Sequence, residues 1–98
     1  MSLIDLTPDN ALMTVRTAVE TVLGVRNAAP TATIAMLDGD SLDRLEIVLA
    51  LEELTGLDLP EVMVSTGRDT VGDIAEALSN IWARAQARSN RFADHNRT

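Results

Sequence analysis

The sequence contains no cysteine, no tyrosine and no lysine, and it has one Phe and one Trp among its 98 residues. The absence of cysteine excludes disulfides, thiolate metal ligands and a cysteine nucleophile. The scarcity of aromatic residues disfavours a β-sheet core, because strands are enriched in them. A core made of Leu, Val, Ile, Ala and Met favours packed helices instead.

Long apolar runs and a basic surface are also missing. No stretch reaches the length of a transmembrane helix, and residues 1–5 lack the basic and apolar segments of a signal peptide. We therefore expect a soluble cytoplasmic protein without membrane insertion. The net charge is −7, and half of the basic residues lie at the end, namely Arg84, Arg88, Arg91 and Arg97. The remaining acidic body repels nucleic acid and favours partners with basic patches.

The length of the chain fits one small domain with a modest core. We expect this domain to span residues 1–87 and to be monomeric. Residues 88–98 are polar and without a period, which predicts a disordered, Arg-containing tail. The one histidine, His95, lies in this tail far from any Ser or carboxylate partner, so a hydrolytic triad has no support.

Three segments have the pattern of one-sided helices. The first begins at Thr7-Pro8, a hydroxyl cap followed by a proline at the first helical position, and ends near Gly24. Its apolar side carries Leu12, Val15, Val19, Val22 and Leu23. The second begins at Asp40-Ser41 and has no breaker until Gly56. The third is capped by Asp69-Thr70 and carries Val71, Ile74, Ala75, Leu78, Ile81 and Trp82.

Residues 25–40 form a long connection, in which we expect Ile34, Met36 and Leu37 to reach the core. Residues 60–67 have room for one short helical turn. Gly72, early in the last helix, predicts close packing against a neighbour. The chain is therefore predicted to be an all-α, small three-to-four-helix bundle with a long loop between its first two main helices.

Ser41 is the one hydroxyl placed between a long loop and a strong helix, with acidic neighbours on both sides. At a helix N-terminus its oxygen lies near the positive end of the dipole, which tolerates a phosphodiester there. The alternative is that Ser41 is merely the helix cap, and for such a serine taken alone this is the better interpretation.

The helix after Ser41 has two different sides. The side expected to face the core carries Ile47, Val48, Leu51 and Leu54. The other side mixes leucines with carboxylates and suits docking of a partner; it carries Leu42, Leu45, Leu49, Asp43, Glu46 and Glu53. The alternative is that the bundle buries these leucines and leaves the acids as an ordinary solvated strip.

Together these residues resemble the acyl carrier protein family. The resemblance covers residues 7–83 in element order, and it rests on Asp40-Ser41-Leu42-Asp43, Glu46, Val48, Ala50-Leu51-Glu52-Glu53, Gly56, Pro60 and Thr70-Val71-Gly72-Asp73. It implies the four-helix carrier fold. It also implies that a phosphopantetheinyl transferase attaches 4'-phosphopantetheine from coenzyme A to Ser41, with Asp40 and Leu42 beside it.

The resemblance implies further that acyl groups are carried as thioesters on the thiol of the arm, and that the protein is not an enzyme. The acids that match the family's docking residues are Asp43, Glu46, Glu52 and Glu53, with Leu45 and Leu49 exposed among them. Their expected partners are the transferase, acyl- or aminoacyl-loading ligases and acyl-processing synthases, through basic patches. A cleft walled by Val48, Leu51 and Ile74 is where such proteins hold short acyl chains.

Two features depart from the family pattern. The usual Leu-Gly-x-Asp-Ser-Leu reads Leu37-Asp38-Gly39-Asp40-Ser41-Leu42, and Arg44 is a large cation on the core side of its helix. Because Gly-Asp-Ser is similar to peptidyl carriers, an aminoacyl or peptidyl carrier stays open beside a freestanding acyl carrier of fatty-acid, polyketide or related biosynthesis. A helical interaction module without a prosthetic group is the alternative from another class.

A calcium-binding loop that starts at Asp38 is excluded. Such a loop needs a ligand at its fifth position and an acid at its twelfth, where this chain has Leu42 and Leu49. We expect no metal site.

Overall fold

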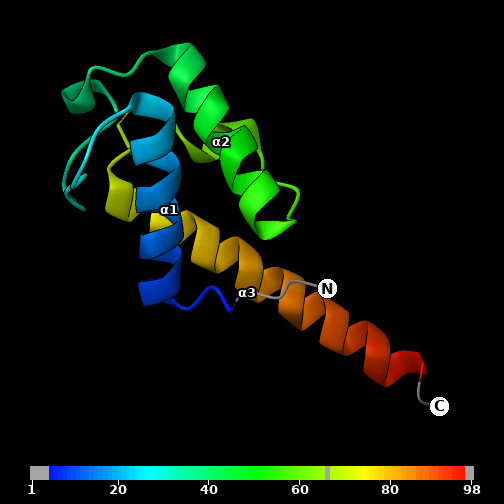
Figure 1. The fold of residues 1–98 in the computed structure, drawn as a ribbon. Helices are drawn as coiled ribbons and strands as arrows, with labels where there is room; N and C mark the ends of the chain where they lie inside the picture. The colour runs from blue at the N-terminus through cyan, green and yellow to red at the C-terminus, as the bar shows by residue number, and fades with distance from the viewer. Residues whose placement is uncertain (1–4, 66, 97–98) are drawn as a thin grey trace.

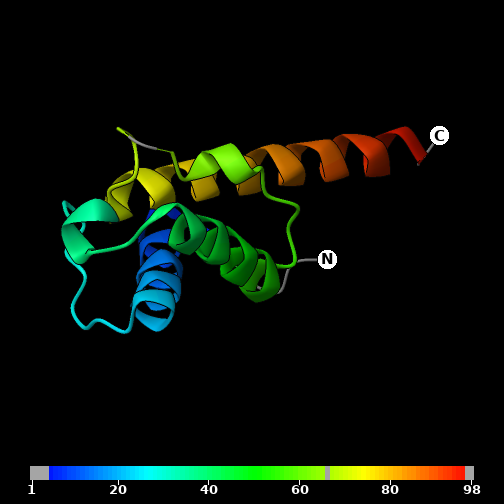
Figure 2. The same ribbon diagram turned by 90° about the horizontal axis from the view of Figure 1, so that it is seen from above.

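The computed structural model describes residues 5–65 and 67–96. It contains the helices α1 (Pro8–Leu23), α2 (Ser41–Thr55) and α3 (Val71–Asn96), with the short 3-10 turns η1 (Ala35–Leu37) and η2 (Glu61–Met63). Figure 1 shows α1 and α2 packed together next to the first half of α3. Seen from above, both lie on the same side of α3 (Figure 2). The predicted small all-α bundle, with a long connection between α1 and α2, is confirmed.

The boundaries of α1 follow from local capping chemistry. The Thr7 hydroxyl accepts a hydrogen bond from the Asn10 amide at 3.5 Å, and Pro8 occupies the first helical position. At the other end Gly24 has a φ of 66°, and its N–H donates to the Glu20 carbonyl. Glycine adopts this left-handed conformation without steric cost, so the helix ends there as predicted.

The core forms where the three helices meet. Side chains that are at most 1% exposed come from every helix, and the larger ones are Val15, Val19, Ile47, Val48, Leu51, Val71, Ile74 and Leu78. Leu6, just before α1, is also fully buried, and its carbonyl accepts a hydrogen bond of 2.9 Å from the Ser79 hydroxyl of α3. This bond ties the beginning of the chain to the last helix.

The long loop between α1 and α2 is fixed against the start of α3. The amides of Val71 and Gly72 donate to the carbonyls of Ala32 and Pro30, at 3.0 and 2.8 Å. A Cβ on Gly72 would lie 3.1 Å from the Pro30 oxygen. The predicted close packing at Gly72 is therefore confirmed, and its neighbour is the backbone of this loop.

Three loop residues were predicted to reach the core, and the structure divides them. Ile34 is fully buried and Leu37 is partly buried against the core, but Met36 is exposed. The prediction for Met36 is wrong. Met36 and Leu37 both lie in the short turn η1, where the side chains of successive residues point in different directions.

The last helix is longer than the sequence analysis predicted. Regular structure was expected to end near Ala87, but α3 continues to Asn96, while Arg97 and Thr98 lie outside the described residues. No Gly or Pro follows Gly72, and the residues after Ala87 include good helix formers, which favours this longer helix. In Figure 1 this half of α3 extends beyond α1 and α2, consistent with a longest dimension of 53 Å.

No helix in residues 5–65 and 67–96 has the length and apolar character needed to cross a membrane.

Candidate functional site

Ser41 is the first residue of α2, and Asp40 is the residue that caps this helix. Asp40 Oδ1 accepts a hydrogen bond of 2.9 Å from the Asp43 amide, and Asp43 Oδ2 accepts one of 3.0 Å from the Asp40 amide. This reciprocal capping box satisfies the backbone at the helix start. The alternative role of Ser41 as the cap is therefore wrong. Its side chain is exposed at the positive end of the helix.

The charge of Asp40 contributes to this arrangement. The hydrogen bond from the Asp43 backbone amide lowers the pKa of Asp40 below its ordinary value and outweighs the desolvation that raises it. Asp40 is thus ionised at neutral pH and holds the first turn of α2 in place. Ser41 is presented on a fixed turn at the junction of loop and helix.

The loop before Ser41 explains why glycine stands at position 39. The Gly39 amide donates to the Ile34 carbonyl at 2.8 Å. A Cβ on Gly39 would collide with Ile34 Cγ2 and would lie 3.1 Å from Leu23 Cδ2. Asp38 has a φ of 63°, a left-handed conformation that glycine adopts more easily. The displaced glycine of this loop is therefore required by packing, and Asp38 occupies the position whose backbone favours glycine.

An open groove lies beside Ser41. It has a volume of about 460 Å³ and is lined by Ser41, Arg44 and Leu45 of α2 and by four side chains between Glu61 and Ser65. Because the latter belong to η2 and the residues after it, the groove runs between α2 and the segment that leads to α3. An extended group attached to Ser41 can lie in it.

Arg44, which lines this groove, belongs to an ion pair that the sequence analysis did not foresee. Arg44 Nε and Nη2 donate to Asp69 Oδ2 at 3.2 and 3.0 Å, and the Arg44 and Asp69 side chains are 17% and 4% exposed. Asp69 was expected to share the cap of α3, but Thr70 alone has that role, since its hydroxyl accepts from the Asp73 amide at 2.9 Å. The position of Arg44 on the core side of its helix could have indicated such a pair in the sequence, because a buried cation requires an acidic partner.

The outer face of α2 combines exposed leucines with carboxylates. Leu42, Leu45 and Leu49 are between 36% and 61% exposed, and Glu46 and Glu53 are exposed among them. We call these five residues the outer face of α2. The predicted core residues Ile47, Val48 and Leu51 are buried, but Leu54 is 44% exposed and its prediction is wrong. Leu54 lies at the edge of the core arc, where it lines a shallow groove with small side chains of α1.

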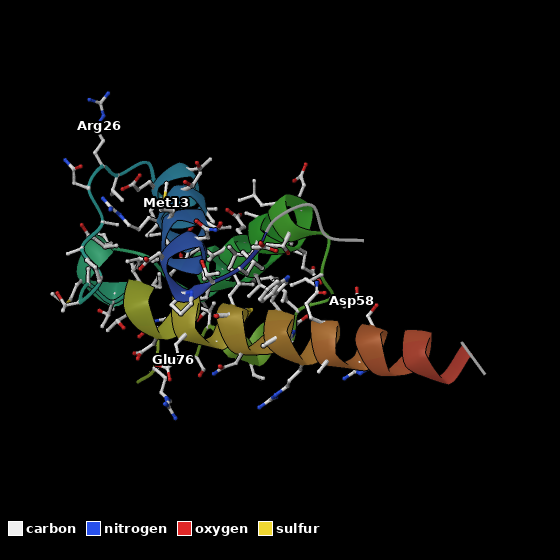
Figure 3. The ribbon with its side chains drawn as sticks, turned by 90° about the horizontal axis from the view of Figure 1, so that it is seen from below. Met13, Arg26, Asp58 and Glu76 are labelled. Carbon is white, nitrogen blue, oxygen red and sulfur yellow. The ribbon has the colours of Figure 1, made fainter. Side chains whose placement is uncertain are left out.

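Two acids of α2 are engaged within the protein. Asp43 completes the capping box, and Glu52 Oε2 accepts a hydrogen bond of 3.0 Å from the Leu59 amide, which fastens the loop after α2. In Figure 3, Glu76 projects from the side of α3 turned away from α1 and α2, and Arg26 extends outward from the loop after α1. Acidic residues also occur on other parts of the surface. What distinguishes the outer face of α2 from those parts is that exposed leucines lie beside its acids.

A family model described as the phosphopantetheine attachment site matches residues 14–78, which is more than half of the chain. The chain belongs to this family. Phosphopantetheine attachment domains bear a covalent 4'-phosphopantetheine and act as carriers that interact with phosphopantetheinyl transferases and with partner enzymes. No curated protein and no solved structure gives a match.

The residues around Ser41 fit the prosthetic group of a phosphopantetheine carrier. The hydroxyl is exposed, Asp40 relieves it of the capping role, and the helix start is favourable for a phosphodiester. The groove beside it offers space for the pantetheine chain along α2.

Proposed function

We propose that Ser41 carries the 4'-phosphopantetheine and that the chain is an acyl carrier in fatty-acid, polyketide or related biosynthesis. The observation that carries this proposal is the division of roles at the start of α2. Asp40 caps the helix, so the Ser41 hydroxyl next to it is exposed and available for modification. The family match supports the cofactor, and the position of Ser41 supports the residue.

Ser41 acts once in this scheme and then serves as an anchor. Its Oγ forms a new bond to the phosphorus that bears pantetheine, the pyrophosphate bond of coenzyme A breaks, and adenosine 3',5'-bisphosphate leaves. The hydroxyl proton passes to a base of the transferase. When bound, the group supplies a terminal thiol that holds cargo as a thioester. The carrier contributes position and recognition, and the enzymes that it visits perform the catalysis.

The outer face of α2 is the proposed docking surface for the transferase and for acyl-loading and acyl-processing enzymes. Glu46 and Glu53 suit basic patches, and Leu45 and Leu49 supply apolar contact area next to them. Such charges increase the rate and selectivity of encounter more than the affinity. Asp43 and Glu52 are bound within the chain, so we expect them to contribute less.

The features that pointed to an aminoacyl or peptidyl cargo have structural explanations. Gly39 is required by its contact with Ile34, and Arg44 pairs with Asp69. Both residues thus have a role in the fold that does not depend on the cargo, and the acyl carrier is the proposal that we retain.

The test is intact-mass analysis after incubation with coenzyme A and a broad-range phosphopantetheinyl transferase. Wild-type protein is expected to gain the mass of one phosphopantetheine, and Ser41→Ala is expected to gain none. Ser65→Ala is the matched control, because Ser65 is an exposed hydroxyl lining the same groove. Modification of Ser41→Ala, or loss of modification in Ser65→Ala alone, contradicts the assignment of Ser41.

A further inference from the structure

Arg44 belongs to the buried side of α2. It precedes Val48 by four residues and Leu51 by seven, and this spacing places all three side chains along one side of a helix. Val48 and Leu51 are at most 1% exposed, and Arg44 is the member of this row nearest to Ser41. The row thus begins with a cation and continues as an apolar core.

Asp69 closes this end of the row. It lies just before the Thr70 cap of α3 and is 25 residues from Arg44 in sequence, yet its Oδ2 accepts both hydrogen bonds of the guanidinium. Since Arg44 lines the groove beside Ser41 and Val48 is its buried neighbour one turn further along, the ion pair lies between groove and core. A group that moves from the groove along this side of α2 toward Val48 meets Arg44 first.

The interior behind the ion pair is filled by the protein itself. Val48, Leu51 and Ile74, which were expected to wall a cleft for the acyl chain, are at most 1% exposed. The groove outside the pair is open to solvent and carries both polar side chains, among them Glu61 and Ser65, and apolar ones, namely Leu45, Val62 and Val64. The space beside Ser41 is therefore mixed in character and lies outside the core.

We propose that the Arg44–Asp69 pair closes the core to the cargo, so that the cargo is a short acyl group that stays in the open groove. The proposal rests on Ser41 as the attachment residue. A long alkyl chain gains by burial in the core only if it separates two charges that have little access to water, and such separation is strongly unfavourable. A short acyl group avoids this cost, because it can lie in the groove against Leu45, Val62 and Val64 without entering the core.

The test uses the full chain loaded at Ser41 with hydrolysis-resistant amide analogues of butyryl- and octanoyl-phosphopantetheine. Intact mass first verifies each loaded form, and an unmodified protein contradicts both the attachment residue and this inference. The melting temperature and the methyl NMR shifts of Val48, Leu51 and Ile74 are then measured. In the wild type we expect the octanoyl and butyryl forms to melt within about 1 °C of each other, with unchanged core methyl shifts, because about 1 kcal/mol of added stability corresponds to several degrees in so small a domain.

Removal of the pair is expected to admit the longer chain. In Arg44→Ala/Asp69→Ala, octanoyl loading should raise the melting temperature by about 5 °C over butyryl loading and shift the core methyl signals. Arg68→Ala is the matched control, because Arg68 is an exposed arginine next to Asp69. Correct loading followed by stabilisation and methyl shifts in the octanoyl wild type overturns the inference while leaving Ser41 assigned. The wild-type comparison decides the question even where the double variant fails to fold.

Discussion

Arg44 and Asp69 join the first turn of α2 to the residue before the cap of α3. Two donors of one guanidinium converge on one carboxylate oxygen, at 3.2 and 3.0 Å, and the aspartate side chain is 4% exposed. The contact fixes the distance between the helix that presents Ser41 and the helix that completes the core. It therefore holds Arg44, one of the side chains that line the groove beside Ser41, in place through a residue far away in sequence.

Asp69→Asn is expected to lower the free energy of unfolding by about 2 kcal/mol, because it replaces a charged acceptor of two hydrogen bonds by a neutral one. Urea denaturation measures the change. Arg44→Met/Asp69→Leu should recover part of the loss, since it removes both charges together. Arg68→Met, at the exposed arginine beside Asp69, should change stability by no more than about 0.5 kcal/mol. Equal effects of Asp69→Asn and Arg68→Met would show that the pair does not stabilise the fold.

Gly39→Ala is expected to destabilise the protein by about 1–3 kcal/mol, because its Cβ would collide with the buried Ile34 side chain. Asp38→Gly is the matched substitution at the neighbouring position. It should be neutral or stabilising by up to about 1 kcal/mol, since glycine adopts the positive φ of this residue without strain. Thermal unfolding of both variants checks the pair of expectations. A stabilising Gly39→Ala would mean that the loop can move away from Ile34.

Acid is expected to weaken the start of α2 through Asp40. The Asp43 amide lowers the pKa of Asp40 in the folded protein, so the stabilisation is present above the ordinary Asp pKa of about 4 and is lost as the pH falls through the lower folded value. Asp40→Asn retains a capping side chain without a charge, and its melting temperature should fall less than that of the wild type below about pH 4. Asp58→Asn, in the exposed loop after α2, is the control. If Asp40→Asn and wild type lose stability in parallel, the capping charge is not the acid-sensitive group.

The parts of the fold that sequence analysis predicted are those encoded by neighbouring residues. Thr7-Pro8 and Gly24 bound α1, and the start of α2 at Asp40-Ser41 was also correct, because caps form within one turn. Which of Asp40 and Ser41 caps the helix could be decided only from the structure. Either side chain can accept from the helix amides, and only the backbone conformation decides which one does.

The parts that sequence analysis missed depend on contacts between distant residues. The pairing of Arg44 with Asp69 spans 25 residues, and Glu20 Oε2 similarly accepts the Ala28 amide at 3.0 Å to hold the loop after α1. A carboxylate in a polar stretch gives no local sign that it binds a backbone amide elsewhere. The prediction that Leu54 is buried was wrong for a related reason. Its position on the helix is compatible with burial, but the facing residues of α1 are too small to cover it.

Leu49→Ala is expected to lower kcat/KM of the phosphopantetheinyl transferase about tenfold, the equivalent of about 1.4 kcal/mol, if this exposed side chain is buried on docking. Leu54→Ala is the matched control, because Leu54 is an exposed leucine of the same helix outside the outer face. Both variants should fold, which the melting temperature verifies. Similar losses in the two variants would contradict docking through the outer face of α2.

Glu53→Gln tests the charge of the same face by its dependence on salt. The substitution removes one exposed carboxylate and should slow association with the transferase several-fold at low ionic strength. Because the Debye length shortens to about 3 Å at 1 M salt, the difference from wild type should disappear there, whereas the effect of Leu49→Ala should persist. Asp58→Asn removes a charge outside α2 and is the control. A decrease in the association rate of Glu53→Gln that is independent of salt would mean that Glu53 acts by direct contact, and not through the electrostatic field of the outer face of α2.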